Sequence, residues 1–122
     1  MNKTTDTTKV TTIDAAGQTL GRVASAAAKA LMGKTRADYT PHIASGTSVE
    51  ISNASKLKVR ETKLASQQYQ NYSGYPGGQR VETLKSLASR KGYGAAIRLA
   101  VQRMLPNNTL RPGRMKKLHI TE

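Results

Sequence analysis

Apolar residues follow two different spacings in the first third of the chain. Residues 10–15, V-T-T-I-D-A, are rich in β-branched side chains, which predicts a strand. Over 19–32 the apolar residues recur at helical spacing, as Leu20 and Val23 illustrate, and Gly33 suits a helix C-cap. Because this helix is mostly alanine, we expect it to pack closely on a sheet.

Extended segments are predicted again in the middle of the chain. Residues 39–43 contain a proline and read as an extended link. In 47–54 the apolar Val49 and Ile51 alternate with polar neighbours, which predicts a second strand. In 56–70 apolar residues again alternate with cations at the start of the stretch, and we expect a third strand that leads through a polar segment to a glycine-rich stretch.

Two helices and a basic segment are predicted in the last third. Leucines and alanine share one helical face in 81–91, and a second apolar stripe runs through 95–105 until Pro106 ends it. Residues 110–117 read as an irregular basic tail, and 118–121 as a last strand. The pattern as a whole predicts an α/β fold.

Length and composition narrow the class of protein. A chain of 122 residues favours one domain, 1–122, with a disordered threonine-rich segment at 1–9. In the free protein we also expect partial disorder around 71–80 and 107–117. Cysteine is absent, which excludes disulfides and cysteine metal sites and fits an intracellular protein. No apolar run approaches a membrane span, and the start lacks the apolar core of a secretory signal, so we expect a soluble, unprocessed protein.

The charge of the chain is strongly positive and unevenly distributed. The chain has 20 Lys and Arg against 7 Asp and Glu, a net charge of +13 and a pI near 10.4. Residues 83–121 hold nine cations and no acid, an arrangement that repels itself unless an anion neutralises it. The leading expectation is therefore a nucleic-acid partner, with an anionic membrane as the second.

The stretch 71–80, N-Y-S-G-Y-P-G-G-Q-R, is the first candidate for contact with that partner. Its glycines and proline are incompatible with a helix interior or a paired central strand, so we expect an exposed loop. Exposed backbone N–H groups, tyrosine rings and a terminal arginine suit a sugar-phosphate chain. The alternative is an ordinary turn whose tyrosines pack on the body. No acid, His or Cys lies in the stretch, which favours binding over catalysis.

Other patterns resemble functional motifs without meeting their requirements. Gly17 and Gly21 lack the three-glycine spacing of a dinucleotide loop, and G-K-T at 33–35 follows a helix and lacks the first P-loop glycine. His42 and His119 stand far apart with no cluster of ligands, so no metal site is expected. Asp14 is expected to be a structural hydrogen-bond acceptor and not a general base.

Four segments in this order resemble one protein family. They are I-D-A-x-G-x-x-L-G-R-x-A-S at 13–25, Y-T-P-H at 39–42, S-G-Y-P-G-G at 73–78 and A-V-x-x-M-L-P-x-N at 100–108. Together they resemble a short form of the bacterial L-thirteen family of large-subunit ribosomal proteins, over about residues 10–121. The resemblance implies a three-layer α/β/α fold with a short, mainly parallel sheet, carrying basic loop and C-terminal extensions.

The resemblance also implies a function and a set of partners. It implies a structural constituent of the large ribosomal subunit, in the cytoplasm, that binds ribosomal RNA, supports subunit assembly, contacts neighbouring large-subunit proteins and has no enzymatic activity. No cofactor, membrane or small-molecule substrate is expected. Two alternatives to this function remain. One is a small nucleotide-binding α/β protein that uses the turn 17–22. The other is a standalone nucleic-acid-binding protein, although the sequence shows no helix-turn-helix pattern.

The candidate RNA-binding residues come from two sources. Motif positions of the family give Arg22, Tyr75, Gly77, Gly78 and Asn107. Charge and position add Lys34, Arg36, Lys56, Arg80, Arg103, Arg111, Arg114, Lys116 and Lys117. No catalytic residue is expected.

Overall fold

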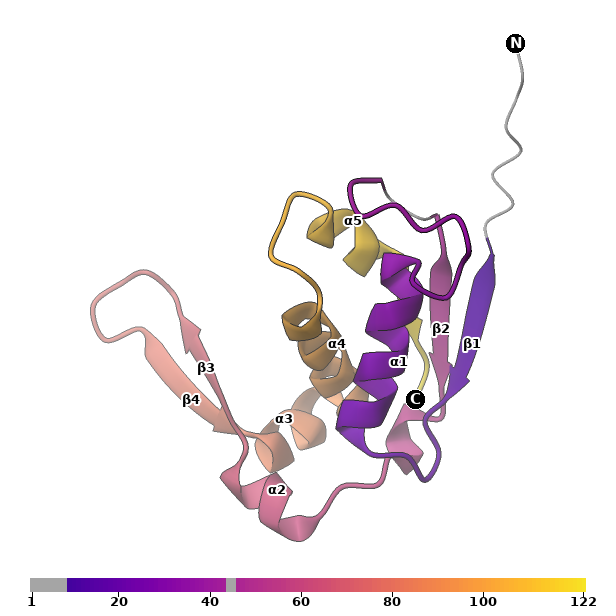
Figure 1. Ribbon diagram of the computed structural model, residues 1–122. Helices are drawn as coiled ribbons and strands as arrows, with labels where there is room; N and C mark the ends of the chain where they lie inside the picture. Colours follow the sequence, from indigo (N-terminus) through magenta and orange to yellow (C-terminus); the bar gives the residue numbers. More distant parts are fainter. Residues whose placement is uncertain (1–8, 44–45) are drawn as a thin grey trace.

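A short parallel sheet organises the body of the protein. The computed structural model describes residues 9–43 and 46–122 (Figure 1). Strands β1 (Val10–Asp14), β2 (Ser48–Ser52) and β5 (Leu118–Ile120) pair in the order β1-β2-β5, all parallel. These are the first, second and last strands that the sequence predicts. The disorder expected at 1–9 falls, apart from its last residue, outside the described residues.

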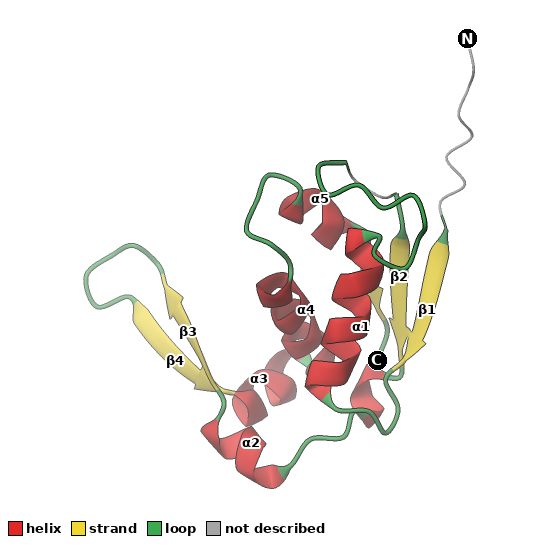
Figure 2. Ribbon diagram, in the orientation of Figure 1, coloured by secondary structure: helices red, strands yellow, loops and turns green. Residues whose placement is uncertain are grey.

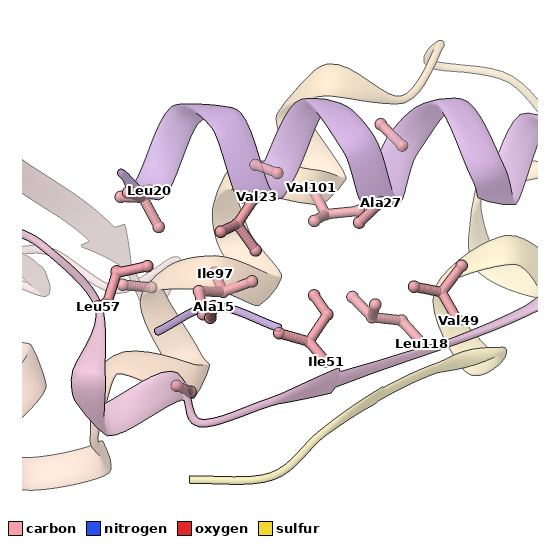
Figure 3. Close-up of a cluster of buried hydrophobic side chains, with 14 of the residues drawn as sticks. Ala15, Leu20, Val23, Ala27, Val49, Ile51, Leu57, Ile97, Val101 and Leu118 are labelled. Atoms are coloured by element: carbon pink, nitrogen blue, oxygen red, sulfur yellow. The ribbon is translucent and has the colours of Figure 1, made fainter. Parts of the chain in front are cut away.

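Two helices cover one face of this sheet. Helix α1 (Leu20–Met32) packs against α4 (Tyr93–Met104), and both lie over the face from which Val49 and Ile51 point. Figure 3 shows Ile51 beneath Val23 of α1, with Ile97 of α4 beside them. Alanines on the buried side of α1 bring the two helices close together, as their side chains take little room.

The opposite face of the sheet is polar. Thr12, Glu50 and His119 are exposed there, one from each strand. Within the described residues, the second helical layer of the expected three-layer arrangement does not form, because these side chains give it no apolar surface to cover. The α/β class and the short, parallel sheet are confirmed.

A β-hairpin projects from the body as an arm (Figure 2). Strands β3 (Gln68–Tyr72) and β4 (Gln79–Thr83) pair antiparallel, so the expected loop at 71–80 is wrong at both ends. Only 73–78 is a turn, and it holds all the glycines and the proline of the stretch. Apart from Val81, the residues of the two strands are polar or aromatic, and they can pair because each strand is an edge.

The predicted strand at 56–60 is also wrong. Asn53 has a left-handed backbone, φ 57°, which reverses the chain after β2 into the 3-10 helix η1 (Ala54–Lys56). Beyond it the alternating residues form one isolated bridge, Thr19 to Lys58. Helix α2 (Glu61–Ser66) then leads into the arm.

The last third is more helical than expected. Helix α3 (Leu84–Lys91) follows β4 directly, since 81–83 complete that strand, and Gly92 at φ +81° separates α3 from α4. The expected basic tail instead contains α5 (Arg111–Lys116), with a proline in its first turn, where a missing N–H costs nothing.

Candidate nucleic-acid interface

The turn between β1 and α1 uses its backbone N–H groups within the protein. The N–H group of residue 16 donates to the carboxylate of Asp14 at 3.0 Å. That of residue 17 donates to the carbonyl of Lys56, and that of residue 18 to the carbonyl of Ala15, both at 3.1 Å. A phosphate-binding loop needs such donors free. This geometry disfavours the alternative of a nucleotide site at 17–22.

Asp14 is a structural acceptor, as expected. Its Oδ1 also accepts from the side-chain amide of Asn53 at 3.0 Å. The Ala16 N–H, followed by the Asn53 amide, lowers the pKa of Asp14 below its ordinary value. The carboxylate therefore links β1 to the turn after β2 and stays ionised.

A shallow hollow runs along α1 above β1. It measures about 630 Å³, and Arg22 and Lys29 line it together with Thr11 of β1 and Thr35. Lys34 follows the Gly33 C-cap, whose left-handed turn returns two N–H groups to the end of α1. The G-K-T tripeptide is thus a helix C-cap, and the hollow offers a cationic surface.

The tip of the arm is exposed and conformationally constrained. Tyr75 is 75% exposed and Tyr72 is 69% exposed. Gly77 has φ +74°, where other residues are strained. A side chain on Gly78 would collide with the Ser73 hydroxyl and lie 2.9 Å from the Tyr75 carbonyl oxygen. Both glycines are therefore required for the shape of the turn.

At the base of the arm, Tyr69 and Arg103 form a cation–π pair. The Arg103 guanidinium lies 5.4 Å from the centroid of the Tyr69 ring. Tyr69 is 6% exposed, and this burial raises the pKa of its hydroxyl. Arg103 is exposed, and among the described residues no hydrogen bond or ion pair to it is formed. Its N–H donors therefore remain available to a ligand.

A cationic hollow of about 280 Å³ lies between the arm and helices α3 and α4. Arg90, Lys91, Arg98 and Arg103 line it, with Glu82 as an acidic member. Arg90 binds both carboxylate oxygens of Glu82, at 3.1 and 2.7 Å, and lowers the pKa of that carboxyl.

Arg98, in the same hollow, has a structural role. Its guanidinium donates to the carbonyl of Leu118 at 3.2 Å and to that of Met115 at 3.5 Å. It therefore joins α4 to β5 and α5, while Lys91 and Arg103 keep their charges facing the hollow.

The structure distributes the predicted residues over several surfaces. Arg22 lies on α1, Lys34 just after its C-cap, Tyr75 and Arg80 on the arm, and Arg103 at the base of the arm. The exposed candidates are Arg22, Lys34, Lys56, Tyr75, Gly77, Arg80, Arg103, Asn107 and Lys116. Gly78, Arg36, Arg111 and Lys117 are half-buried.

Two predicted cations are less available than expected. Arg114, in the last turn of α5, is 4% exposed and its Nε has no hydrogen-bond partner, so in this structure it is not available as a surface phosphate contact. Arg36 makes an ion pair with Asp38 at 2.9 Å, which partly neutralises it. Local sequence gives no sign that Arg114 turns inward.

Sequence reasoning missed Lys63, Tyr69, Lys91 and Arg98. Tyr69 lies just before the glycine-rich stretch and was assigned only to a polar connection. Lys91 and Arg98 belong to the acid-free run 83–121, which marked the region without distinguishing its members. Lys63 comes close to Arg103 only through the tertiary fold.

Metal and membrane sites do not emerge from the described chain. Across residues 9–43 and 46–122, no three His, Asp or Glu side chains gather where they could hold a metal ion. In the same residues no helix has the length and apolar character to cross a bilayer.

Comparison with known proteins decides the family. The sequence matches the family model described as Ribosomal protein L13 over residues 8–122. The chain belongs to the ribosomal protein L13 family. It is 45% identical over 108 residues to the large ribosomal subunit protein uL13 of Lachnoclostridium phytofermentans, an alignment that covers 88% of this chain and 74% of that protein. It is 44% identical to the uL13 proteins of Nitrosococcus oceani and Aquifex aeolicus, over 88% of this chain and 75% and 74% of theirs.

Membership of the L13 family accounts for the four motifs. The L-G-R segment begins α1, S-G-Y-P-G-G forms the tip of the arm, and M-L-P ends α4. Proteins of the L13 family are structural components of the ribosome and not enzymes. The expectation of a non-enzymatic protein is therefore confirmed.

Proposed function

We propose that this L13 protein binds ribosomal RNA within the large ribosomal subunit and supports the assembly of that subunit. The observation that carries the proposal is family membership, since its relatives are named large ribosomal subunit proteins. That family places the chain in the ribosome, which is cytoplasmic in bacteria. The partners proposed for it are large-subunit ribosomal RNA and the proteins next to it.

The charge distribution supports RNA as the molecule bound. With 20 cations against 7 acids, most cations have no acidic partner within the chain. Arg22, Arg80 and Arg103 are exposed on α1, the arm and α4, so phosphates can be neutralised on several sides of one small body. Phosphate contacts of this kind supply affinity that falls as salt rises.

The arm supports recognition of irregular RNA. Proteins that recognise particular RNA sites usually contact unpaired loops and bulges, using aromatic rings for stacking and backbone groups at close approach. The tip offers the exposed Tyr72 and Tyr75 rings and a turn held in shape by Gly77 and Gly78. A protein of this form would bring together RNA segments during assembly.

Co-sedimentation tests the proposal directly. An affinity-tagged copy expressed in its source cells should travel with the large subunit through a sucrose gradient after a high-salt wash, and depletion of the chain should cause large-subunit precursors to accumulate. Release by the wash, together with equal affinity for structured RNA and duplex DNA at the same salt, would instead favour a standalone nucleic-acid-binding protein.

A further inference from the structure

A second, smaller hollow lies on the other side of the Tyr69 and Arg103 pair. It measures about 230 Å³ and lies where the first turn of α1, helix α2, the start of β3 and the last turn of α4 meet. These elements are labelled in Figure 1. Arg103 and Tyr69 line both this hollow and the cationic one beneath the arm, so the cation–π pair lies between the two.

The walls of this hollow are apolar and its polar groups are few. Leu20, Ala100 and Met104 supply the apolar surface. Met104 is 43% exposed, and the Ser25 hydroxyl donates to its sulfur at 3.6 Å, which holds the thioether in place. No acid lines the hollow. An exposed apolar surface next to uncompensated cations suits a ligand that is flat and apolar on its faces and anionic elsewhere.

The three polar residues of the hollow match the remaining parts of such a ligand. Lys63 is a point charge suited to a phosphate. Gln67 has a side-chain amide that can both donate to and accept from the edge of a base. Arg103 presents a guanidinium 5.4 Å from the centroid of the Tyr69 ring, and RNA bases stack on guanidinium planes.

We propose that this hollow binds one unstacked base of the ribosomal RNA, with the base stacked on Arg103 and its phosphate neutralised by Lys63. The inference rests on the proposed function, because it names what one surface of the RNA-binding protein receives. In this proposal the Arg103 guanidinium stacks on a base. From its charge alone, Arg103 is expected to bind a phosphate.

Gly21 provides the test, because it lines the hollow and its position has open space. A Cβ built there meets nothing within 4 Å. Gly21 also lines the shallow hollow along α1, so a leucine there narrows both hollows. Gly21→Leu should also improve helix propensity, so its unfolding temperature should equal or exceed that of the unmodified protein. Ala26→Leu is the matched control, since Ala26 is exposed on the same helix and lines the shallow hollow along α1 but not the proposed base site.

The probe is full-length large-subunit ribosomal RNA bound by the intact chain. Gly21→Leu should lose about 5- to 150-fold in affinity, the effect of removing one base stack. One unpaired nucleotide that the unmodified protein protects from dimethyl sulfate or carbodiimide should regain its reactivity. Hydroxyl-radical protection of the RNA backbone elsewhere should persist. Ala26→Leu should keep the protected base.

Arg103→Lys supplies an independent variant. It keeps the charge but removes the plane, so the base should lose protection while the salt dependence of binding stays the same. Equal footprints and affinities for Gly21→Leu, Ala26→Leu and the unmodified protein would overturn the hollow as a base site while leaving RNA binding intact. Failure of the unmodified protein to bind the RNA would instead overturn the proposed function.

Discussion

The body and the arm of this L13 protein are stabilised in different ways. In the body, Val23, Ile51 and Ile97 have almost no exposed surface, and burial of such side chains is the main source of folding free energy. In the arm, Tyr69 is the one buried residue of the two described strands, and Val81 is 53% exposed. An isolated hairpin with so little burial is marginal in water. The arm therefore adds little to the stability of the body, and the role proposed for it is contact with RNA.

The arm depends on a few contacts at its base. The hydroxyl of Thr83 accepts from the Ser86 N–H at 3.3 Å and caps α3 directly after β4. Arg90 of α3 holds Glu82 of β4. Tyr69 packs into the body from β3. Local opening of the arm should therefore cost less free energy than global unfolding.

Removal of a core side chain should have the largest effect and should separate the two regions. Ile97→Ala should lower the free energy of unfolding by about 2 to 5 kcal/mol, since it leaves a cavity between α4 and the sheet. Val81→Ala on the arm should change it by less than about 0.5 kcal/mol. Urea denaturation of both variants measures the difference. Similar losses would show that the arm is part of the folding core.

Acid should produce a smaller effect that reaches both regions. The pKa values of Asp14 in the body and Glu82 in the arm are lowered in the folded state, so their ionised forms stabilise it at neutral pH. This stability should be lost as the pH falls below about 4, when the carboxyls take up protons. Hydrogen exchange of the β3 and β4 amides measures this effect in the arm. In the unmodified protein these amides should lose protection on acidification, and in Glu82→Gln this loss should be smaller. An unchanged acid response in that variant would contradict a role for the Glu82 and Arg90 pair.

The sequence predicts the body well because its signals are local. Val49 and Ile51 alternate, and the apolar face of 19–32 repeats at helical spacing, so strand and helix follow directly. The arm was predicted as a loop, because its strands lack a continuous apolar face and the turn residues at 74–78 dominate the stretch. The alternation at 56–60 was misleading, since the reversal at Asn53 depends on a single left-handed residue.

The candidate interface was predictable only in outline. Charge and motifs indicate a basic, RNA-binding protein, and the exposed positions of Tyr75 and Arg80 agree with that prediction. Pairs such as Tyr69 with Arg103 join residues far apart in the chain, and the inward turn of Arg114 depends on how α5 packs. Side-chain direction of this kind is set by tertiary contacts, which local patterns do not encode.

The most direct test of an RNA-binding arm is the dependence of RNA affinity on salt for two variants. The first is a charge variant that removes up to three phosphate contacts and leaves the buried Arg114 in place. In it, three cations are changed together to Ala: Arg111, Lys116 and Lys117. Gly77→Val with Gly78→Val alters the shape of the arm's tip without changing any charge. Both should be titrated with large-subunit ribosomal RNA and with a scrambled RNA over a range of potassium concentrations.

The charge variant should lower the slope of log affinity against log salt by roughly 0.7 to 0.9 per lost contact and change specificity little. The glycine variant should lose affinity for the ribosomal RNA while its slope and its unfolding temperature stay nearly constant. The same slope change in both variants, or an unchanged affinity in the glycine variant, would contradict the arm as an element that recognises RNA by shape.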